Sequence, residues 1–346
     1  MVAKTGALMN TETSPPTADS KLDQLRLLAD NTGRLMVIAV DHRANLRAAL
    51  SSAAGRDVGA GELIEFKRAV VRTLSTGCSA ALLDPEYGLP AAQLRASNCG
   101  LLLAYEKSGY DNARPGRRPD LLTNQSVFRL REAGAQAIKL LLHYSNLEDS
   151  SVNEEKMAFV ERVGAECHAH LLPFFLEIIT YDSTGSLSPI ELARRRPALI
   201  GAAVSEFSRP RYFVDVLKLE LPVAANLLKG AFGESSEGLS RAEALRQIRQ
   251  ALASARQPVV FLSGGVSVSD FIAGIELAAE SGISFHGALC GRAIWNGGIG
   301  AYAQAGARNG AEARLERWLS EEGAANLAAV RTCLARRATP LPSGVA

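Results

Sequence analysis

Charged side chains interrupt three of the most apolar segments in this sequence of 346 residues. Lys139 stands inside AIKLLLHY, Glu177 inside FFLEIIT, and Lys218 inside VLKLELP. An unpaired charge is costly on a strand face that packs against helices, so these groups are expected where they can pair and meet solvent. We therefore expect the two lysines and the carboxylate to converge in one pocket.

Two lysines and a carboxylate suit chemistry at a carbonyl carbon. A neutral amine can attack the carbonyl and form a Schiff base, whose iminium accepts the electrons released when a neighbouring C–C bond breaks. Free lysine is protonated at neutral pH, and both burial and a second cation favour the neutral amine. Lys139 could supply that cation and hold a substrate oxygen or phosphate, while Glu177 moves protons. For any one charge a structural Lys–Glu network is an equal alternative, but three charges on successive strands favour catalysis.

Two glycine-containing turns indicate a phosphate site. FLSGGVS contains Ser263, Gly264 and Gly265, and ALCGRAIW contains Gly291 and Arg292 directly before a predicted helix. Glycine lets a phosphate approach the backbone N–H groups, a helix N-terminus favours an anion, and arginine adds a bidentate donor. Either turn alone is weak evidence, because tight turns often need glycine. Together, after neighbouring strands, they predict a phosphate cradle.

The elements that carry these residues alternate between short apolar runs and longer amphipathic segments. Nearly continuous hydrophobicity in the runs predicts strands covered on both faces, as in a parallel sheet. Eight such units match the size of a (β/α)8 TIM barrel, in the α/β class, whose active site lies at the carboxyl ends of the strands. A doubly wound open sheet is the alternative, but no G-x-G-x-x-G follows the first strand. The eight predicted strands are 35–41, 80–84, 101–106, 137–144, 174–180, 216–222, 259–265 and 285–291.

The segment KLDQLRLLAD (21–30) predicts an extra N-terminal helix that closes the bottom of the barrel. We expect a single barrel domain over 21–338, with a disordered N-terminal tail at 1–20 and a C-terminal tail at 339–346. Three long polar connections are expected on the active-site face. They span residues 109–120, 182–189 and 229–240.

Composition excludes several classes of protein. A net charge of +2, from 38 basic and 36 acidic residues, gives no field that would attract nucleic acid or a membrane surface. There is no apolar run of 18 residues, and the first twenty residues lack a signal-peptide pattern, so we expect no membrane segment and a cytoplasmic location. The five cysteines include no C-x-x-C pair, which indicates reduced thiols. The five histidines form no ligand set with carboxylates, so we expect no metal and no cofactor.

Eight segments between the first and the last predicted strand match the pattern of a known family. They are AVDHRANL, LLDPEYGLP, AIKLLLHY, VNEEKMAFVERVGAEC, PFFLEIITYD, VLKLELPV, LSGGVS and LCGRAIW. The run DPEYGLP and the segments around Glu177 and Lys218 are the most specific of them. Together they resemble the tagatose-1,6-bisphosphate aldolases, which are class I, Schiff-base aldolases. The resemblance implies reversible cleavage of D-tagatose 1,6-bisphosphate to dihydroxyacetone phosphate and glyceraldehyde 3-phosphate, without a metal.

The resemblance also implies roles for individual residues. Lys218 resembles the Schiff-base lysine and Glu177 the acid–base carboxylate. Lys139 and Asp41 resemble the residues beside the reacting carbonyl and hydroxyl groups. The two glycine-containing turns resemble a phosphate cradle.

One departure from the family concerns the turn after the first strand. The family reads Asp-Gln-Arg-Gly there, whereas this sequence reads Asp41-His42-Arg43-Ala44. That turn helps to hold the distal end of the substrate, so His42 and Arg43 are expected to bind substrate, and His42 leaves the distal group open. Arg43 could instead pair with a neighbouring acid. A related branch cleaves 6-deoxy-6-sulfofructose 1-phosphate, which carries a sulfonate at that end.

Three functions therefore stand as alternatives. They are a ketose 1,6-bisphosphate aldolase, a sulfofructose-phosphate aldolase giving dihydroxyacetone phosphate and sulfolactaldehyde, and a sugar-phosphate-binding regulator without turnover. The intact set of Lys139, Glu177 and Lys218 argues against the regulator, because a protein that only binds has no need of a neutral amine. The expected partner is a phosphorylated ketose, and the outer helices of a barrel are compatible with a homodimer.

Overall fold

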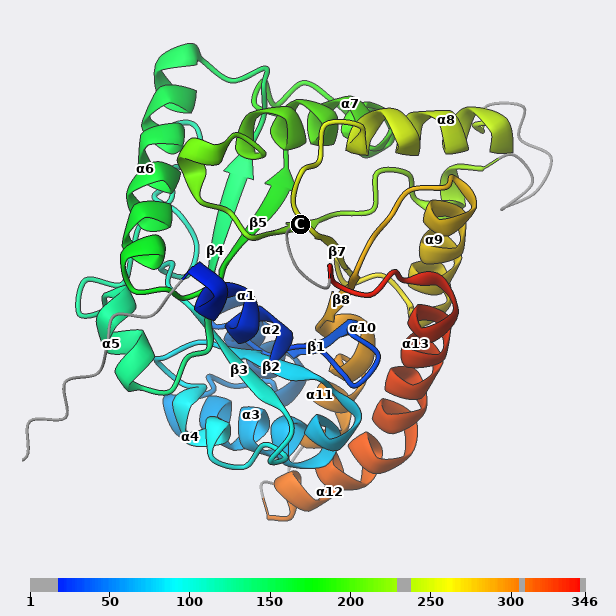
Figure 1. Cartoon of the computed structure of the whole chain (residues 1–346). Helices are drawn as coiled ribbons and strands as arrows, with labels where there is room; N and C mark the ends of the chain where they lie inside the picture. Colours follow the sequence, from blue (N-terminus) through cyan, green and yellow to red (C-terminus); the bar gives the residue numbers. More distant parts are fainter. Residues whose placement is uncertain (1–17, 229–237, 305–308, 343–346) are drawn as a thin grey trace, which may run out of the picture.

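The computed structural model describes residues 18–228, 238–304 and 309–342. Eight parallel strands close into a barrel, in which each strand pairs with the next along the chain and β8 pairs with β1 (Figure 1). The predicted (β/α)8 barrel is thereby confirmed. The strands are β1 (Leu35–Ala39), β2 (Ala80–Leu83), β3 (Gly100–Ala104), β4 (Ala137–Tyr144), β5 (Phe174–Thr180), β6 (Val216–Leu219), β7 (Val259–Leu262) and β8 (Gly287–Cys290).

Helices surround the strands on the outside of the barrel (Figure 1). They are α2 (Ala44–Ala54), α3 (Ala60–Leu74), α4 (Leu89–Ala92), α5 (Val127–Glu132), α6 (Ser150–Ala169), α7 (Pro189–Phe207), α8 (Arg241–Leu252), α9 (Val268–Glu280), α10 (Arg292–Trp295), α11 (Gly298–Tyr302), α12 (Ala311–Trp318) and α13 (Ala324–Arg337). Single helical turns lie at Ser75–Gly77, Pro210–Tyr212, Ala225–Leu227 and Leu319–Gly323.

Alternate residues of each strand pack on opposite faces of the barrel wall. In β1, Leu35, Val37 and Ala39 belong to the inner layer, whereas Met36 and Ile38 pack with the surrounding helices. Both faces are apolar because the helices cover the outside and the closed sheet packs on itself inside. This double burial explains the continuous hydrophobicity that predicts the strands.

The N-terminal helix α1 (Ala18–Arg26) closes one end of the barrel, as predicted (Figure 1), but it begins and ends earlier than the expected range 21–30. Leu25 and the following Leu28 are buried against the inner layer of strand residues. Lys21 Nζ lies 2.8 Å from Asp215 Oδ2, directly before β6. The opposite end, where the strands finish, is left for the site.

The strands end earlier than the sequence predicts at several carboxyl ends. Asp41, Asp84 and Glu106 lie one or two residues beyond β1, β2 and β3 rather than inside them. The chain turns at these points. Asp41 and Glu106 both reach Lys139. Asp84 pairs instead with Lys67 of α3. The same shortening places the two glycine-containing turns directly after β7 and β8.

The limits expected for the barrel domain, 21–338, stay a prediction; helices extend from Ala18 to Arg337. Residues 1–17 and 343–346 of the expected tails, and 229–237 of one expected polar connection, lie outside the described residues. Within the described ranges, no helix combines the length and the hydropathy needed to cross a membrane.

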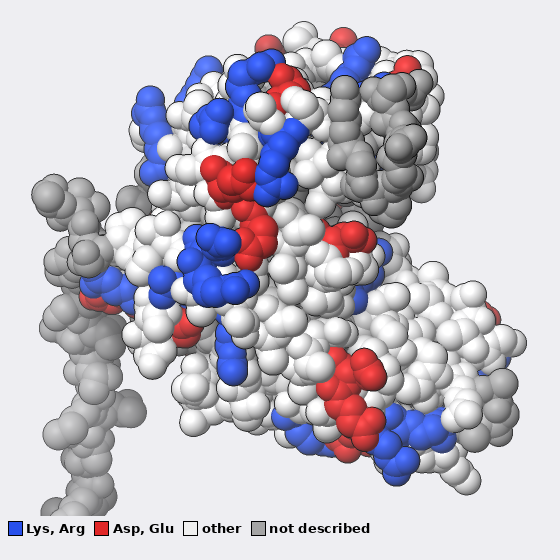
Figure 2. Space-filling view, turned by 90° about the vertical axis from the view of Figure 1, so that its right-hand side faces the viewer, with Lys and Arg blue, Asp and Glu red and all other residues white. Residues whose placement is uncertain are grey.

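Acidic and basic side chains are interspersed on the face that carries α8, α9 and α13 (Figure 2). Arg241 at the start of α8 pairs with Glu280 of α9, and Arg337 of α13 pairs with Glu276 of α9 at 2.5 Å. This face therefore shows no field of one sign, in keeping with the small net charge.

Candidate active site

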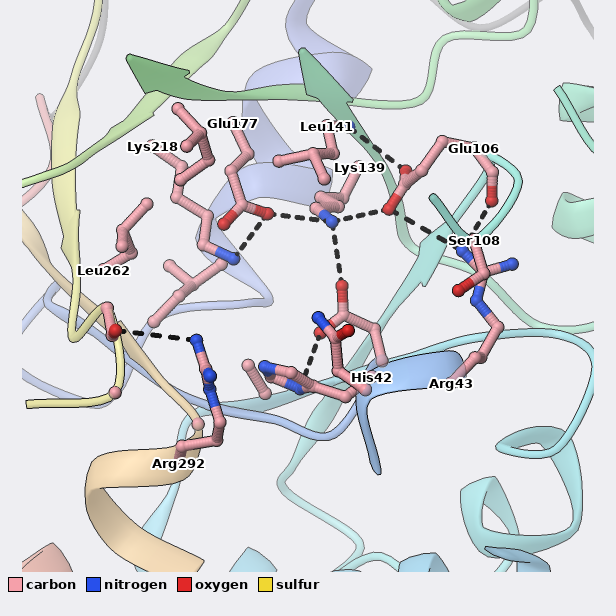
Figure 3. Close-up of a pocket in the computed structure, with 18 of the residues that line it drawn as sticks. His42, Arg43, Glu106, Ser108, Lys139, Leu141, Glu177, Lys218, Leu262 and Arg292 are labelled. Carbon is pink, nitrogen blue, oxygen red and sulfur yellow. Dashed lines mark hydrogen bonds and ion pairs between the residues drawn. The ribbon is translucent and has the colours of Figure 1, made fainter. Parts of the chain in front are cut away.

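A cavity of about 520 Å³ opens at the carboxyl ends of the strands. All of the residues predicted for the site line it, and Figure 3 shows how the charged ones converge. They are Asp41, His42, Arg43, Lys139, Glu177, Lys218, Ser263, Gly264, Gly265, Gly291 and Arg292. The structure thus brings residues that follow or belong to six strands around one space.

Lys139 lies at the centre of the charged groups. Its Nζ is 2.8 Å from Asp41 Oδ2, 2.6 Å from Glu106 Oε1 and 2.8 Å from Glu177 Oε2. Burial alone would lower the pKa of Lys139, but these three carboxylates outweigh burial and raise the pKa well above its usual range. Lys139 is therefore a permanent cation at neutral pH.

Glu177 bridges the two lysines. Its Oε2 is 2.9 Å from Lys218 Nζ as well as 2.8 Å from Lys139 Nζ, and in Figure 3 its carboxylate stands between the two amines. Glu177 and Lys218 are direct register partners on β5 and β6, so the strand pairing itself sets this contact. Burial would raise the pKa of Glu177, but the charges of the two lysines hold it below its usual value.

The contacts of Lys139 differ from those expected of a cation that acts on Lys218. Because Lys139 Nζ touches three carboxylates, its charge is balanced within the cluster. Asp41 shows the reciprocal effect: burial would raise its pKa, but Lys139 and Lys218 hold it well below the usual range. These contacts favour a role for Lys139 in fixing the carboxylates and in meeting substrate oxygens.

The turn after β7 and the start of α10 form one wall of the cavity. Gly264 and Gly265 have φ values of 59° and 83°, in the left-handed region that favours glycine. A Cβ on Gly265 would lie 3.0 Å from the Arg292 guanidinium carbon, so glycine here allows arginine to lie against the turn. Arg292 Nη2 donates to the Gly264 carbonyl oxygen at 3.5 Å. The glycines of this turn and the Arg292 side chain therefore line the same corner of the cavity.

His42 lies beside this wall rather than across the cavity from it. A Cβ on Gly291 would lie 2.9 Å from His42 Cε1, and the imidazole meets the Trp295 ring edge-on at 5.2 Å. Burial, opposed by Asp41 and reinforced by Arg292, lowers the pKa of His42 to about 4. Its Nδ1 is buried without a hydrogen-bond partner among the described residues, 3.7 Å from Asp41 Oδ1. The neutral His42 ring thus lies near the turns expected to bind phosphate. The family resemblance instead implies that His42 is near the distal end of the substrate.

Arg43 is buried and engaged with its neighbours. Its guanidinium donates to Glu86 Oε2 and to the carbonyl oxygen of Glu106, both at 2.6 Å. Of the two roles open to Arg43, these contacts favour pairing with an acid, and they tie the turn after β1 to the end of β3.

Sequence reasoning missed two parts of the site. Glu106 contacts Lys139 directly, and its place at the end of an apolar run was the available signal. The second part is Lys67 on α3, which is fully buried and pairs with the buried Asp84. Lys67 Nζ also donates to the carbonyl oxygens of Val40 (2.5 Å) and His42 (2.8 Å). It thereby holds the backbone on both sides of Asp41, and nothing in the amphipathic pattern of that helix points to this.

Among the described residues, no group of three or more His, Cys, Asp or Glu side chains is arranged to hold a metal ion.

Glu220, which shares a strand face with Lys218, accepts hydrogen bonds from the N–H and hydroxyl of Thr180, both at 2.7 Å. It therefore braces the end of β5.

Comparisons with known proteins identify the family of this chain. Residues 35–297 match the model of a family described as DeoC/LacD family aldolase. The chain is 43% identical over 311 residues to tagatose 1,6-diphosphate aldolase 1 of Enterococcus faecalis, covering 90% of this chain and 93% of that protein. It is 39% identical to tagatose 1,6-diphosphate aldolase of Listeria monocytogenes over 92% of this chain and 93% of that one.

A solved structure shows the fold alone. Fructose-bisphosphate aldolase from Plasmodium falciparum, in complex with TRAP and a small-molecule inhibitor, superposes with a TM-score of 0.66 at 16% identity. The superposition covers 95% of this chain and 97% of that one. With the family match and the relatives at about 40% identity, the conclusion is direct: this chain belongs to the DeoC/LacD family of aldolases and is an aldolase, a lyase.

Proposed function

We propose that this chain is a class I aldolase that cleaves a ketose 1,6-bisphosphate, in the first instance D-tagatose 1,6-bisphosphate, through a Schiff base on Lys218. The observation that carries the proposal is the position of Glu177 Oε2, 2.9 Å from Lys218 Nζ and 2.8 Å from Lys139 Nζ. One carboxylate is therefore within proton-transfer distance of the amine that would attack the carbonyl. The products are dihydroxyacetone phosphate and glyceraldehyde 3-phosphate.

The first half of the reaction forms the iminium. Lys218 passes a proton to Glu177, and its neutral amine then adds to the C2 carbonyl of the ketose. Glu177 returns a proton to the hydroxyl of the carbinolamine, which leaves as water. Lys139 and Asp41, held together at 2.8 Å, flank the reacting carbon and can orient its hydroxyl neighbours.

The second half breaks the carbon–carbon bond. The C4 hydroxyl loses its proton to Glu177, the C3–C4 bond breaks, and its electron pair moves into the iminium to give an enamine. Glyceraldehyde 3-phosphate leaves as the aldehyde. Glu177 then gives its proton to C3 of the enamine, and addition of water to the resulting iminium releases dihydroxyacetone phosphate and restores Lys218.

The phosphate on C1 fits the turns after β7 and β8. C1 is bonded to C2, so this phosphate must lie near Lys218, and β7 is the strand next to β6 in the barrel. Arg292 and the left-handed turn at Gly264 and Gly265 offer a guanidinium and backbone N–H groups there. The two relatives are tagatose 1,6-diphosphate aldolases, which supports a second phosphate on C6.

Borohydride trapping tests the proposal. The protein is incubated with dihydroxyacetone phosphate and sodium borohydride, and the modified residue is identified by mass spectrometry. We expect a reduced adduct on Lys218 that is lost in Lys218→Met. Lys21→Met, a lysine at the closed end of the barrel, is the matched control and should leave the adduct unchanged. Absence of an adduct, or loss of activity in EDTA, would overturn the mechanism.

Rates of cleavage then choose the substrate. Tagatose 1,6-bisphosphate, fructose 1,6-bisphosphate and 6-deoxy-6-sulfofructose 1-phosphate share the C1 phosphate and the C2 carbonyl, and differ at C4 or at C6. We expect the highest kcat/KM with the tagatose substrate. Preference for the sulfonate would move the chain to the sulfofructose-phosphate alternative while leaving the Schiff base in place.

A further inference from the structure

The cavity has a second wall that the proposed cleavage chemistry leaves unused. It is formed beyond β3 and β4, which lie across the closed barrel from β7 and β8. Its lining residues are Lys107, Ser108, Gly109, Tyr110 and His143. A bisphosphate held by one phosphate at the β7–β8 turns would extend from Lys218 towards this opposite wall.

The Arg117 guanidinium lies over two aromatic rings beside this wall. Its guanidinium carbon lies 5.3 Å from the centre of the Tyr110 ring and 4.6 Å from that of Tyr181. His143 meets the same two rings edge-on, at 5.1 Å from Tyr110 and 6.3 Å from Tyr181. A guanidinium that lies over an aromatic ring can still use its in-plane N–H donors to bind an anion.

Three other basic side chains near this wall pair with carboxylates, and Lys156, whose Nζ lies 4.9 Å from the centre of the Tyr181 ring, donates to the Tyr181 hydroxyl at 2.9 Å. Lys107 pairs with Asp120 at 2.7 Å, Arg118 with Glu155 at 2.6 Å, and Arg43 with Glu86 at 2.6 Å. In the described ranges, no carboxylate lies within 4.0 Å of the Arg117 guanidinium. Arg117 thus brings a positive charge without a counter-ion close to the cavity.

The backbone at Arg117 is strained. Its φ is 47°, in the left-handed region, and it follows Gly116 at 89°. A non-glycine residue pays about 1–2 kcal/mol for that conformation, and such strain persists where surrounding contacts enforce it, often at ligand sites. Tyr181 helps to enforce it, since its hydroxyl contacts the Gly116 carbonyl oxygen at 3.1 Å. In this strained backbone conformation, the Arg117 side chain lies over the rings of Tyr110 and Tyr181.

His143 supplies a neutral donor on the same wall. It shares the inward face of β4 with Lys139, four residues earlier. Burial and the positive charges of Arg117 and Lys156 lower the pKa of His143 to about 4. The negative charge of Glu177 opposes this shift but does not outweigh it. A neutral imidazole and the Tyr110 hydroxyl can each donate one hydrogen bond to an oxyanion.

We propose that Arg117, with Tyr110 and His143, forms a subsite for the tetrahedral oxyanion at the far end of the substrate, a phosphate or a sulfonate on C6. The inference rests on the proposed function, because it assumes that C1 faces the β7–β8 turns. It also assigns the distal group to residues beyond β3 and β4, and not to His42, which packs against Gly291 on the near side.

Paired substrates test the subsite. The kcat/KM of Arg117→Met is compared with that of the unaltered protein for a ketose 1,6-bisphosphate, the corresponding ketose 1-phosphate and a 6-sulfo ketose 1-phosphate. We expect a loss of roughly 10- to 100-fold for substrates with a C6 oxyanion, as for one lost charge-assisted contact. The ketose 1-phosphate should change by less than about twofold, because it makes no such contact. Arg114→Met, an exposed arginine on the same connection, is the matched control.

Calorimetric binding provides a readout that needs no turnover. Glyceraldehyde 3-phosphate, which carries the C6 phosphate, should bind more weakly to Arg117→Met, whereas dihydroxyacetone phosphate should bind equally to both proteins. Equal losses for all three substrates, or no loss for any, would overturn the subsite. If the Lys218 adduct fails to form but glyceraldehyde 3-phosphate binding still depends on Arg117, the proposed mechanism fails and the anion subsite stands.

Discussion

The buried pair of Lys67 and Asp84 offers the sharpest test of how the site is held. Both side chains are fully buried, and Lys67 also donates to the carbonyl oxygens of Val40 and His42. Lys67→Met leaves the Asp84 carboxylate buried without its cation, which costs about 3–5 kcal/mol. It also leaves two backbone carbonyls without a donor, each an added cost of about 1 kcal/mol or more. We expect the free energy of unfolding to fall by about 5–7 kcal/mol.

A double-mutant cycle separates these two contributions. In Lys67→Met with Asp84→Asn the uncompensated charge is gone, and the asparagine oxygen can still accept from the Tyr87 N–H that Asp84 Oδ2 binds at 2.7 Å. The double variant should therefore recover about 2 kcal/mol relative to Lys67→Met alone, a coupling in the range measured for contacting residues. Urea unfolding followed by the fluorescence of the buried Trp295 measures all four proteins.

Two results would refute this reasoning. One is a urea unfolding midpoint of Lys67→Met equal to that of the unaltered protein, because removing the cation from the fully buried Asp84 carboxylate must lower the free energy of unfolding. The other is a double variant no more stable than Lys67→Met, which would assign the whole effect to the carbonyls. Where Lys67→Met folds, kcat should also fall, because the backbone on both sides of Asp41 is released.

Two further predictions concern pH and the phosphate wall. The pKa values of His42 and His143 are about 4 in the folded protein against 6.5 ordinarily, so between pH 6.5 and 4 the unfolded chain takes up protons that the folded chain does not. The free energy of unfolding should therefore decrease as pH falls through that window, by up to about 2.7 kcal/mol per pH unit for the two histidines. Urea unfolding midpoints measured across this pH range should show the decrease. Replacing both His42 and His143 with Gln should flatten the pH dependence, whereas the control His168→Gln, on the exposed surface of α6, should leave it unchanged. Gly265→Ala places a methyl group 3.0 Å from the Arg292 guanidinium at a φ of 83°. Its KM for a ketose 1-phosphate should rise about tenfold, and an unchanged KM would remove this turn from the phosphate site.

The strands and the charged residues inside them could be predicted because both depend on local pattern. In a run such as VLKLELP, the apolar residues predict a buried strand and the lysine stands out as a charge inside it. The pairing of β5 with β6 then places Lys218 beside Glu177. The strand ends were less predictable. Asp41 and Glu106 read as the last residues of apolar runs, yet the chain has already turned when it reaches them.

Contacts between distant segments could not be predicted from pattern. Lys67 lies in a helix whose spacing of polar and apolar residues is ordinary, and only packing shows that its amine enters the core to meet Asp84. Arg117 lies in a polar connection expected on the active-site face, but its contacts with Tyr110 and Tyr181 depend on how that connection packs against the residue after β5. The side of the cavity on which His42 lies follows from the closure of β8 on β1, which no single segment encodes.

The two buried lysines of the site differ in how many carboxylates hold them, and this difference favours one nucleophile over the other. Lys139 has three carboxylate partners that together hold its proton, and an ammonium has no lone pair with which to attack a carbonyl. Lys218 contacts the single oxygen Glu177 Oε2, which it shares with Lys139. A proton that leaves Lys218 can move to that oxygen while Lys139 stabilises the rest of the cluster. Removing one of the partners of Lys139, as in Glu106→Gln, should therefore weaken its positioning without transferring the Schiff base, and an adduct that moved to Lys139 in this variant would contradict the assignment.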